Sequence, residues 1–326
     1  MSKSYEEYLK EAGNIHLAYY LEAADILNIK YKVVVPGLIA MFETEGKHWF
    51  IINTVTPLTN TPSTTIAKRK NLTNKILSSF NIPVPKQVTL ITKEDAIKFF
   101  KDYKDIVIKP SQQLGGIGVT LLPQSKKQVV NAFNNAYKMS KGKGLNKVIG
   151  EEFIHGENYR LLVLDKRVIA VVRRKSAFVV GNGKDTLERL IKEKNIQRKK
   201  NLLKPILIDN EVNQRLQNLK ISLKYIPKDG EEVILRYNCN LTTGGTTQEC
   251  FEQTHQYYKD IAVQAVQAIG AKFGGVDIIT TDITKPVKCV INEINYNPGL
   301  RLHYKVDQGT VVKVAVPIQE YISKII

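Results

Sequence analysis

The sequence is poor in the residues and patterns that mark several protein classes. It has only five histidines and three cysteines without CxxC spacing (Cys239, Cys250 and Cys289), which argues against a disulfide framework or a structural zinc site. Its longest apolar stretch, near Val33–Phe42, is far shorter than the roughly 20 residues of a membrane helix. The first residues lack the apolar segment of a secretory signal. We therefore expect a reducing, cytoplasmic setting and no membrane partner.

Acidic residues are scarce relative to basic ones. The chain has 48 Lys and Arg against 31 Asp and Glu, a net charge of +17, which favours an anionic partner such as nucleic acid, a nucleotide or an acidic substrate. Its 326 residues correspond to about two domains, and 43% hydrophobic residues suffice for a sizeable core. The segment Lys192–Lys204 has six basic residues and one acid, a pattern typical of a solvated helix face and loop.

The first 60 residues have the pattern of a small α/β unit. Helical spacing over Tyr5–Leu27 precedes β-branched runs at Tyr31–Val35 and His48–Val55. The uncharged segment Asn53–Thr65 contains two prolines and predicts a linker, which a helix over Ile66–Phe80 follows.

Strands and helices then alternate from Val88 onward. Thr92 predicts an N-cap, because Asp95 follows three residues later. Later strands form hairpins, such as the one at the turn Asp165-Lys166. This order predicts an α+β fold rather than a simple doubly wound sheet.

Three oxygen-bearing side chains near the end of the chain are candidate metal ligands. Asp277 lies among apolar residues of one predicted strand, and in the next strand Glu293 and Asn295 alternate so that both point to one face. Carboxylate and carbonyl oxygens suit Mg²⁺, which binds a few carboxylates together with phosphate oxygens. From the residues alone, Asp277, Glu293 and Asn295 could equally be polar residues that cap turns at strand ends.

A lysine and a glycine-rich loop form a candidate phosphate site. Lys109 lies in the segment Ile106–Pro110 after three apolar residues, and Gly115, Gly116 and Gly118 follow. Backbone N–H groups of such a loop can surround phosphates. The loop matches neither a Walker nor a Rossmann pattern, and a plain hairpin turn remains the alternative.

Two further segments combine polar residues with glycines. A strand ending at Glu151 and Glu152 could offer backbone contacts to an adenine edge, although an ordinary strand and turn fits equally well. The segment Leu235–Gly245 places an arginine, asparagines and threonines before a Gly pair, which suits an anion, and Arg173 and Arg174 offer similar contacts.

In this order, the segments resemble the ATP-grasp superfamily, in particular its carboxylate–amine ligases such as cyanophycin synthetase and bifunctional glutathione synthetase. The motifs read KP with a Gly-rich loop, E-E-F-I-x-G-x-x-Y-R, L-R-x-N-x-N-x-x-T-G-G, and V-D-x-x-x-x-D with E-x-N-x-N-P. The likeness runs from about Thr61 to Ile326. It implies an α+β ATP-grasp fold in which two α+β subdomains clamp ATP.

The resemblance also implies domains and roles. Residues 1–62 would be a reduced pre-ATP-grasp unit and 63–326 the ATP-grasp domain, with a lid subdomain near 106–155 and a catalytic subdomain near 156–326. The implied nucleotide contacts are Lys70, Lys109, Gly115, Gly116, Gly118, Glu151, Glu152, Phe153, Ile154 and Asn158. The implied metal ligands are Asp277, Glu293 and Asn295; the implied catalytic residues are Arg174, Arg236 and Asn240; and the implied substrate contacts are Thr243, Gly244 and Gly245.

The implied activity is ADP-forming carbon–nitrogen ligation. ATP, with two Mg²⁺ ions (or Mn²⁺), would activate a carboxylate as an acyl-phosphate, and an amine would then form the amide. Asn158 stands where the family usually has a glutamate, and Thr246–Glu249 departs from the family pattern, so the acceptor is left open among amino acids and small or acidic peptides. The alternatives are an ATP-grasp kinase and a non-catalytic ATP- or nucleic-acid-binding protein. A homo-oligomer is also left open.

Overall fold

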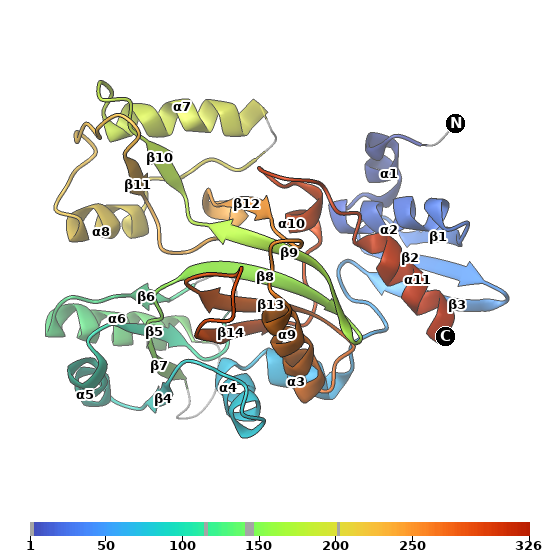
Figure 1. Cartoon of the computed structure of the whole chain (residues 1–326), viewed down its shortest axis with the longest axis horizontal. Coiled ribbons are helices and arrows are strands. Elements are labelled where there is room, and N and C mark those ends of the chain that lie inside the picture. The colour runs from blue at the N-terminus through green and yellow to red at the C-terminus, as the bar shows by residue number, and fades with distance from the viewer. Residues whose placement is uncertain (1–2, 114–116, 141–146, 201–202) are drawn as a thin grey trace. The chain divides into compact units, whose positions relative to one another are not determined.

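The computed structural model describes residues 3–113, 117–140, 147–200 and 203–326 (Figure 1). The chain forms two compact units. Unit 1 comprises Met1–Val172 and Glu249–Ile326, and unit 2 comprises Arg173–Gln248. In sequence, unit 2 is therefore an insertion into unit 1.

Two helices and a small sheet form the N-terminal part of unit 1. They are α1 (Tyr5–Ala12), α2 (Ile15–Ile26) and the antiparallel strands β1 (Lys30–Val35), β2 (Ile39–Thr44) and β3 (Lys47–Ile52). The helical stretch predicted over Tyr5–Leu27 is interrupted at Gly13, which has a φ of 66°. A Cβ there would lie 2.8 Å from the backbone nitrogen of Gly37, so only glycine fits. The side chain of Asn14 then caps α2.

The C-terminal helix completes the core of this part. Helix α11 (Ala315–Ile325) packs against α2 (Figure 1), so segments from the two ends of the chain share one hydrophobic core. A buried hydrogen bond joins them, because Trp49 donates from its indole nitrogen to the side-chain oxygen of Gln319 at 3.0 Å. The amide nitrogen of Gln319 donates in turn to the carbonyl oxygen of Tyr20 at 3.4 Å.

The segment predicted as a linker and one helix contains two helices. These are α3 (Thr61–Ala67) and α4 (Lys70–Ser79). Helix α3 begins inside the predicted linker because Asn60 and Ser63 form a capping box, in which each side chain accepts a hydrogen bond from the other residue's backbone nitrogen.

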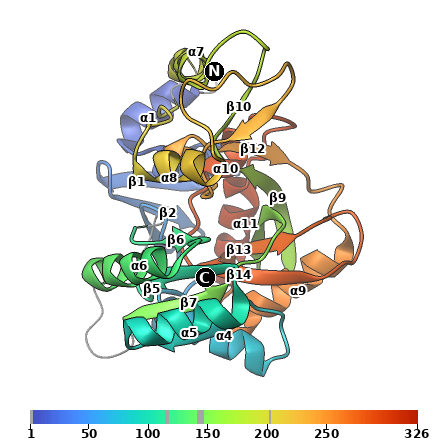
Figure 2. The ribbon, with the colours of Figure 1, turned by 90° about the vertical axis from the view of Figure 1, so that its left-hand side faces the viewer.

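A four-stranded sheet follows, with strand order β4-β7-β5-β6. The strands are β4 (Gln87–Leu90), β5 (Ile106–Pro110), β6 (Thr120–Leu121) and β7 (Val148–Glu152). Helices α5 (Lys93–Tyr103) and α6 (Lys126–Met139) lie side by side and share a core with this sheet (Figures 1 and 2). Thr92 caps α5 through a capping box with Asp95, which confirms that prediction.

The larger sheet has the strand order β12-β9-β8-β13-β14. Its strands are β8 (Glu157–Leu164), β9 (Arg167–Lys175), β12 (Thr246–Glu249), β13 (Phe273–Thr280) and β14 (Cys289–Asn295). Helix α9 (Gln256–Ala268) packs on β8, β13 and β14, and α4 contacts β14 as well. The short helix α10 (Arg301–Tyr304) follows β14 in the chain.

Unit 2 has a small core of its own. Strands β10 (Phe178–Val180) and β11 (Glu232–Ile234) pair antiparallel, and their buried side chains pack with those of α7 (Leu187–Lys200) and α8 (Asn210–Asn218). A 3₁₀ turn over Leu241–Thr243 precedes a left-handed Gly244.

The mixture of helices with antiparallel sheets confirms the predicted α+β class. The predicted boundaries at residue 62 and near residue 155 stay predictions. No helix within the described ranges combines the length and apolar character needed to cross a bilayer.

The Trp49–Gln319 contact yields a stability prediction. Replacing Gln319 with methionine keeps the side-chain volume but leaves the buried indole N–H of Trp49 without its acceptor and removes the additional donor to the carbonyl oxygen of Tyr20. We expect the free energy of unfolding to fall by about 1–3 kcal/mol, measured by urea denaturation. The exposed Gln264→Met on α9 is the matched control, and equal stability of the two variants would refute the prediction.

Candidate active site

Two carboxylates and an arginine lie in one row across three strands. Arg160 on β8 pairs in register with Asp277 on β13, and Asp277 pairs with Glu293 on β14. Arg160 binds Asp277 through two hydrogen bonds, from Nε to Oδ1 at 2.5 Å and from Nη2 to Oδ2 at 2.8 Å. Arg160 is 9% exposed and Asp277 is 3% exposed. Such a buried bidentate pair fixes both side chains.

The field around Arg160 keeps its guanidinium charged. Burial by itself lowers the pKa of Arg160, but the negative charges of Asp277 and Glu293 outweigh this effect, so that the pKa is raised. A buried positive charge is therefore a permanent part of this site.

The three predicted metal ligands lie on the same face of this sheet. The register of β13 and β14 shifts after Asp277, so that Asn292 is an extra residue in β14. Glu293 remains opposite Asp277, and Asn295 lies two residues further on, opposite Gly275. The amide nitrogen of Asn295 donates to the carbonyl oxygen of Gly275 at 3.3 Å, which turns the side-chain nitrogen toward the backbone.

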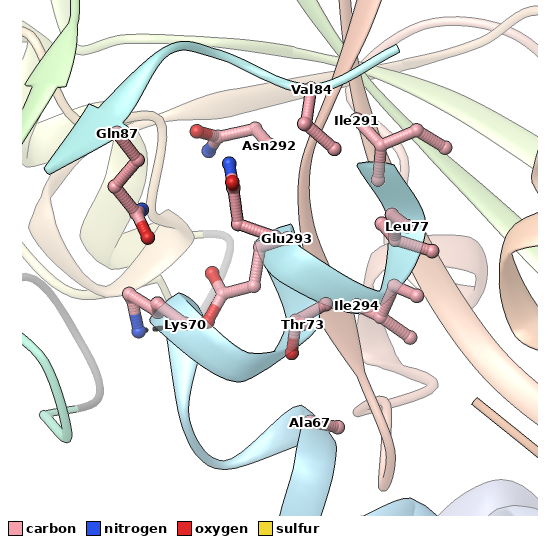
Figure 3. A pocket seen from close by; sticks show the side chains of 11 residues that line it. Ala67, Lys70, Thr73, Leu77, Val84, Gln87, Ile291, Asn292, Glu293 and Ile294 are labelled. Carbon is pink, nitrogen blue, oxygen red and sulfur yellow. Dashed lines mark hydrogen bonds and ion pairs between the residues drawn. The ribbon is translucent and has the colours of Figure 1, made fainter. Parts of the chain in front are cut away.

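Lys70 brings a cation to the same carboxylates. It begins α4, and its Nζ lies 3.1 Å from Oε1 of Glu293 and donates to the carbonyl oxygen of Gln113 at 3.0 Å. Figure 3 shows Lys70 and Glu293 turned toward each other in a small pocket, with Gln87 and Asn292 beside them. The pocket is lined by side chains of α3, α4, β4 and β14 and by Val84.

Lys109 has a different environment from Lys70. Its Nζ lies 2.6 Å from Oε1 of Glu151, and both side chains are buried. Gln87 donates to the other oxygen of Glu151 at 2.8 Å. The two predicted phosphate-binding lysines are thus each paired with a carboxylate, Lys70 in a partly exposed position and Lys109 in a buried one.

The predicted glycine loop is only partly described. Gly115 and Gly116 lie outside the described residues. Gly118 has a φ of 73°, and a Cβ there would lie 2.9 Å from Cβ of Met139 and from Cγ of Pro110. The end of the loop therefore requires glycine.

The predicted adenine segment belongs to the four-stranded sheet and the turn after it. The backbone nitrogen of Glu152 donates to the carbonyl oxygen of Lys86, and that of Phe153 donates to the carbonyl oxygen of Asp105, both at 2.9 Å. Asn158 is half-buried in β8 opposite Ile279. The nucleotide contacts assigned to 151–154 and to Asn158 stay predictions.

The remaining predicted residues belong to unit 2. Arg174 lies in β9, whereas Arg236 is 2% exposed and is held by two acids. Its Nη2 lies 2.6 Å from Oδ2 of Asp209, and its Nη1 lies 2.7 Å from Oε2 of Glu211. Burial alone would raise the pKa of Asp209. The hydrogen bonds from Arg236 and from backbone nitrogens together have the larger effect, so the pKa of Asp209 lies below its ordinary value.

The loop with Asn240, Thr243, Gly244 and Gly245 is fixed by hydrogen bonds within unit 2. Thr243 donates from Oγ1 to the side-chain oxygen of Asn238 at 2.5 Å and to the carbonyl oxygen of Asn240 at 3.1 Å. Gly244 has a φ of 108°, and a Cβ there would lie 2.6 Å from Ile206. The structure therefore brings these predicted residues into one tight loop.

An arginine that sequence analysis assigned to a solvated surface supports this loop. Arg198 in α7 is 3% exposed. Its guanidinium donates to four carbonyl oxygens at 2.8–3.4 Å, those of Lys204, Leu241, Gly244 and Gly245. The expectation for Lys192–Lys204 is wrong at this residue, because its charge is used to satisfy backbone carbonyls.

Two further residues beside the candidate site were missed. Arg160 belongs to the quoted Y-R motif, but its partner lies 117 residues away, and no local pattern marks the pair. His303 in α10 is 1% exposed, and neither ring nitrogen has a hydrogen-bond partner among the described residues. Burial, together with the charge of Arg160, lowers the pKa of His303 to about 3.

The donor set bears on the predicted metal. Among the described residues, no three or more His, Cys, Asp or Glu side chains gather to hold a metal ion. A metal at this face would therefore depend on two carboxylates, one amide oxygen and groups supplied by a ligand.

Comparison with known proteins gives a consistent set of relatives. Residues 67–179 match the RimK-like ATP-grasp domain. Over 73% of its length the chain is 34% identical to the glutathione biosynthesis bifunctional protein GshAB of Clostridium perfringens, of which it covers 32%. Over 82% of its length it is 32% identical to cyanophycin synthetase of Trichormus variabilis, of which it covers 30%.

A solved structure shares the fold. The crystal structure of a bifunctional glutathione synthetase from Pasteurella multocida matches with a TM-score of 0.68 over 96% of this chain and 44% of that one, at 23% identity. This chain spans about a third of the length of the curated relatives it matches.

Buried His303 predicts a pH dependence of stability. Its ring is neutral in the folded chain, but in the unfolded chain it binds a proton near its ordinary pKa of 6.5. The stability that this neutral ring contributes is complete above pH 6.5 and is lost as the pH falls toward 3. We expect His303→Gln to reduce the loss of unfolding free energy between pH 7 and pH 5 by about 2 kcal/mol.

The free energy of unfolding between pH 7 and pH 5 is measured by urea denaturation. His48→Gln, at an exposed position in β3, is the control. An unchanged pH slope in a folded His303→Gln variant would contradict the prediction.

The role of Arg198 predicts a second stability effect. Arg198→Met removes the donors to the loop carbonyls, and we expect the unfolding free energy of unit 2 to fall by about 2–4 kcal/mol. Lys199→Met, at an exposed position on the same helix, should change it little. Hydrogen exchange at the amides of residues 241–245 measures both variants, and equal protection in the two would refute the assignment.

Proposed function

We propose, from the match of residues 67–179 to the RimK-like ATP-grasp domain, that this chain is an ATP-dependent, ADP-forming carboxylate–amine ligase. It would activate a carboxylate as an acyl-phosphate and couple it to an amine, with an amino acid or a small or acidic peptide as acceptor. The similarity of most of the chain to two such synthetases supports this reaction class. The acceptor is the part of the proposal that the relatives leave open.

The observation that carries the proposal is the juxtaposition of Lys70 with the face that bears Asp277, Glu293 and Asn295. These residues come from distant parts of the sequence, and they supply oxygen donors beside a cation. This is the donor chemistry that a complex of magnesium with a nucleotide phosphate requires. The residues present therefore fit the metal, and Asp277, Glu293 and Asn295 would hold it. A bound magnesium ion would neutralise negative charge on the phosphates.

In unit 1, the chain's own residues would position the nucleotide and its phosphates. Lys70 would bind phosphate oxygens, and for this its Nζ must leave Glu293. Lys109, held by Glu151, which Gln87 holds in turn, would present a second fixed positive charge. Residues 151–154 and Asn158 would bind the adenosine, and the loop ending at Gly118 would cover the phosphates. Positioning and charge neutralisation can carry phosphoryl transfer without a covalent nucleophile.

The residues of unit 2 are proposed to bind the reacting carboxylate. Arg174, Arg236 and Asn240 would stabilise the charge that develops during transfer, an effect often worth a few kcal/mol. Thr243, Gly244 and Gly245 would contact the acceptor. Because Asp209 and Glu211 hold the terminal nitrogens of Arg236, this residue also fixes the segment between β11 and the loop.

ADP release tests the proposal directly. We would screen amino acids and dipeptides as pairs of carboxylate and amine, and identify products by mass spectrometry. A ligase requires both substrates for ADP release, whereas a kinase requires one. ATP binding without turnover of any pair would favour a non-catalytic role.

Glu293→Gln tests the proposed metal ligand. We expect ADP release to fall by about 100-fold or more, because a carboxylate ligand beside the phosphates is lost. Glu320→Gln, at a partly exposed position in α11 where the side chain pairs with Lys324, is the control and should keep the wild-type rate. Full activity of Glu293→Gln would remove Glu293 from the proposed site.

A further inference from the structure

The candidate site contains a row of four charged side chains in unit 1, in which two neighbouring acids lie between two bases. Asp277 and Glu293 occupy directly opposite register positions, where like charges repel. Arg160 binds the Asp277 side of this pair, and Lys70 binds the Glu293 side. The two acids and two bases of the row have no net charge.

The two cations differ in how firmly they are held. Arg160 is buried and makes two parallel hydrogen bonds to Asp277. Lys70 is partly exposed and makes one contact of 3.1 Å to Glu293, beside the pocket of Figure 3. Lys70 can therefore exchange Glu293 for another anion, whereas moving Arg160 would leave Asp277 as a buried charge.

The balance of charge determines which form of a metal this row can accept. A bare divalent cation would meet two carboxylates that are already neutralised, and it would be repelled by the two bases. A metal bound to a triphosphate brings its own negative charges, which Lys70 can bind in exchange for Glu293. The difference between the two cases depends on the positive charges of Arg160 and Lys70.

We propose that Arg160 is a positioning residue that fixes Asp277 and prevents the carboxylate pair from binding a divalent cation alone, so that the metal enters only with a nucleotide phosphate. This inference rests on the proposed function, because it concerns the same site. Arg160 touches neither the nucleotide nor the reacting carboxylate in this assignment. It acts through Asp277, and its signature is the metal affinity of the protein without nucleotide.

Binding of Mn²⁺ tests the inference without any turnover. The electron paramagnetic resonance signal of free Mn²⁺ is titrated with the full chain, first with Mn²⁺ alone and then with the nonhydrolysable ATP analogue AMPPNP, whose own binding of Mn²⁺ is measured without protein and subtracted. We expect the wild-type chain to bind Mn²⁺ weakly alone and at least about tenfold more tightly with AMPPNP. Equal affinity in the two titrations would overturn the proposal.

Variants that remove one positive charge from the row should gain affinity. We expect Arg160→Gln to bind Mn²⁺ alone about tenfold or more tightly than the wild type, and Lys70→Gln to do the same from the other end of the row. Arg160→Lys keeps the charge and should stay near the wild type. Lys313→Gln removes the partner of Glu22 elsewhere in unit 1 and should not gain.

The variants also separate the two proposals. If Arg160→Gln does not fold, as circular dichroism would show, the partly exposed Lys70→Gln still decides the outcome. Folded variants without any gain in Mn²⁺ affinity would refute the role of the row, even where the wild type binds AMPPNP. A wild type that does not bind AMPPNP would refute the proposed function, whereas a gain of Mn²⁺ binding in the variants would still support the charge balance.

Discussion

Two carboxylates that face each other across neighbouring strands are the constraint on which the candidate site depends. Asp277 and Glu293 repel each other at opposite positions of β13 and β14 unless cations offset their charges. Arg160 from β8 and Lys70 from α4 provide that offset. The packing of α4 against β14 and the register of β8 with β13 are therefore electrostatic requirements as well as packing features.

The net positive charge of the chain is unevenly distributed between its two units. Unit 2 contains 16 Lys and Arg residues against 8 Asp and Glu residues, a net charge of +8. The remaining 250 residues carry +9. Part of the excess is used inside the protein, because Arg160, Arg198 and Arg236 are buried and bind carboxylates or carbonyl oxygens. The charge is thus partly structural, and an anionic partner is not needed to explain all of it.

Local patterns were enough to predict part of the fold and of the site. The capping box of Thr92 and Asp95 depends on residues three apart, and the shared face of Glu293 and Asn295 depends on strand alternation. The break at Gly13 was missed because it depends on contact with Gly37, 24 residues away. The contact between Lys70 and Glu293 spans 223 residues. The family resemblance, and not periodicity, assigned both residues to the nucleotide site. The partners of Arg160 and Arg198 were also missed, because no spacing in the sequence marks a carboxylate or a loop carbonyl as the partner of a given arginine.

Each unit satisfies its own buried arginines with partners from the same unit. In unit 1 Arg160 is bound by Asp277, and in unit 2 Arg236 is bound by Asp209 and Glu211 while Arg198 binds carbonyls of the Gly244–Gly245 loop. A buried guanidinium without partners would cost several kcal/mol, so these contacts must form when each unit folds. The carboxylate pair of unit 1 and the polar loop of unit 2 are consequently held in position by the folded chain itself. A ligand would then bind to surfaces that already have their geometry, and less of its binding energy would be needed to order them.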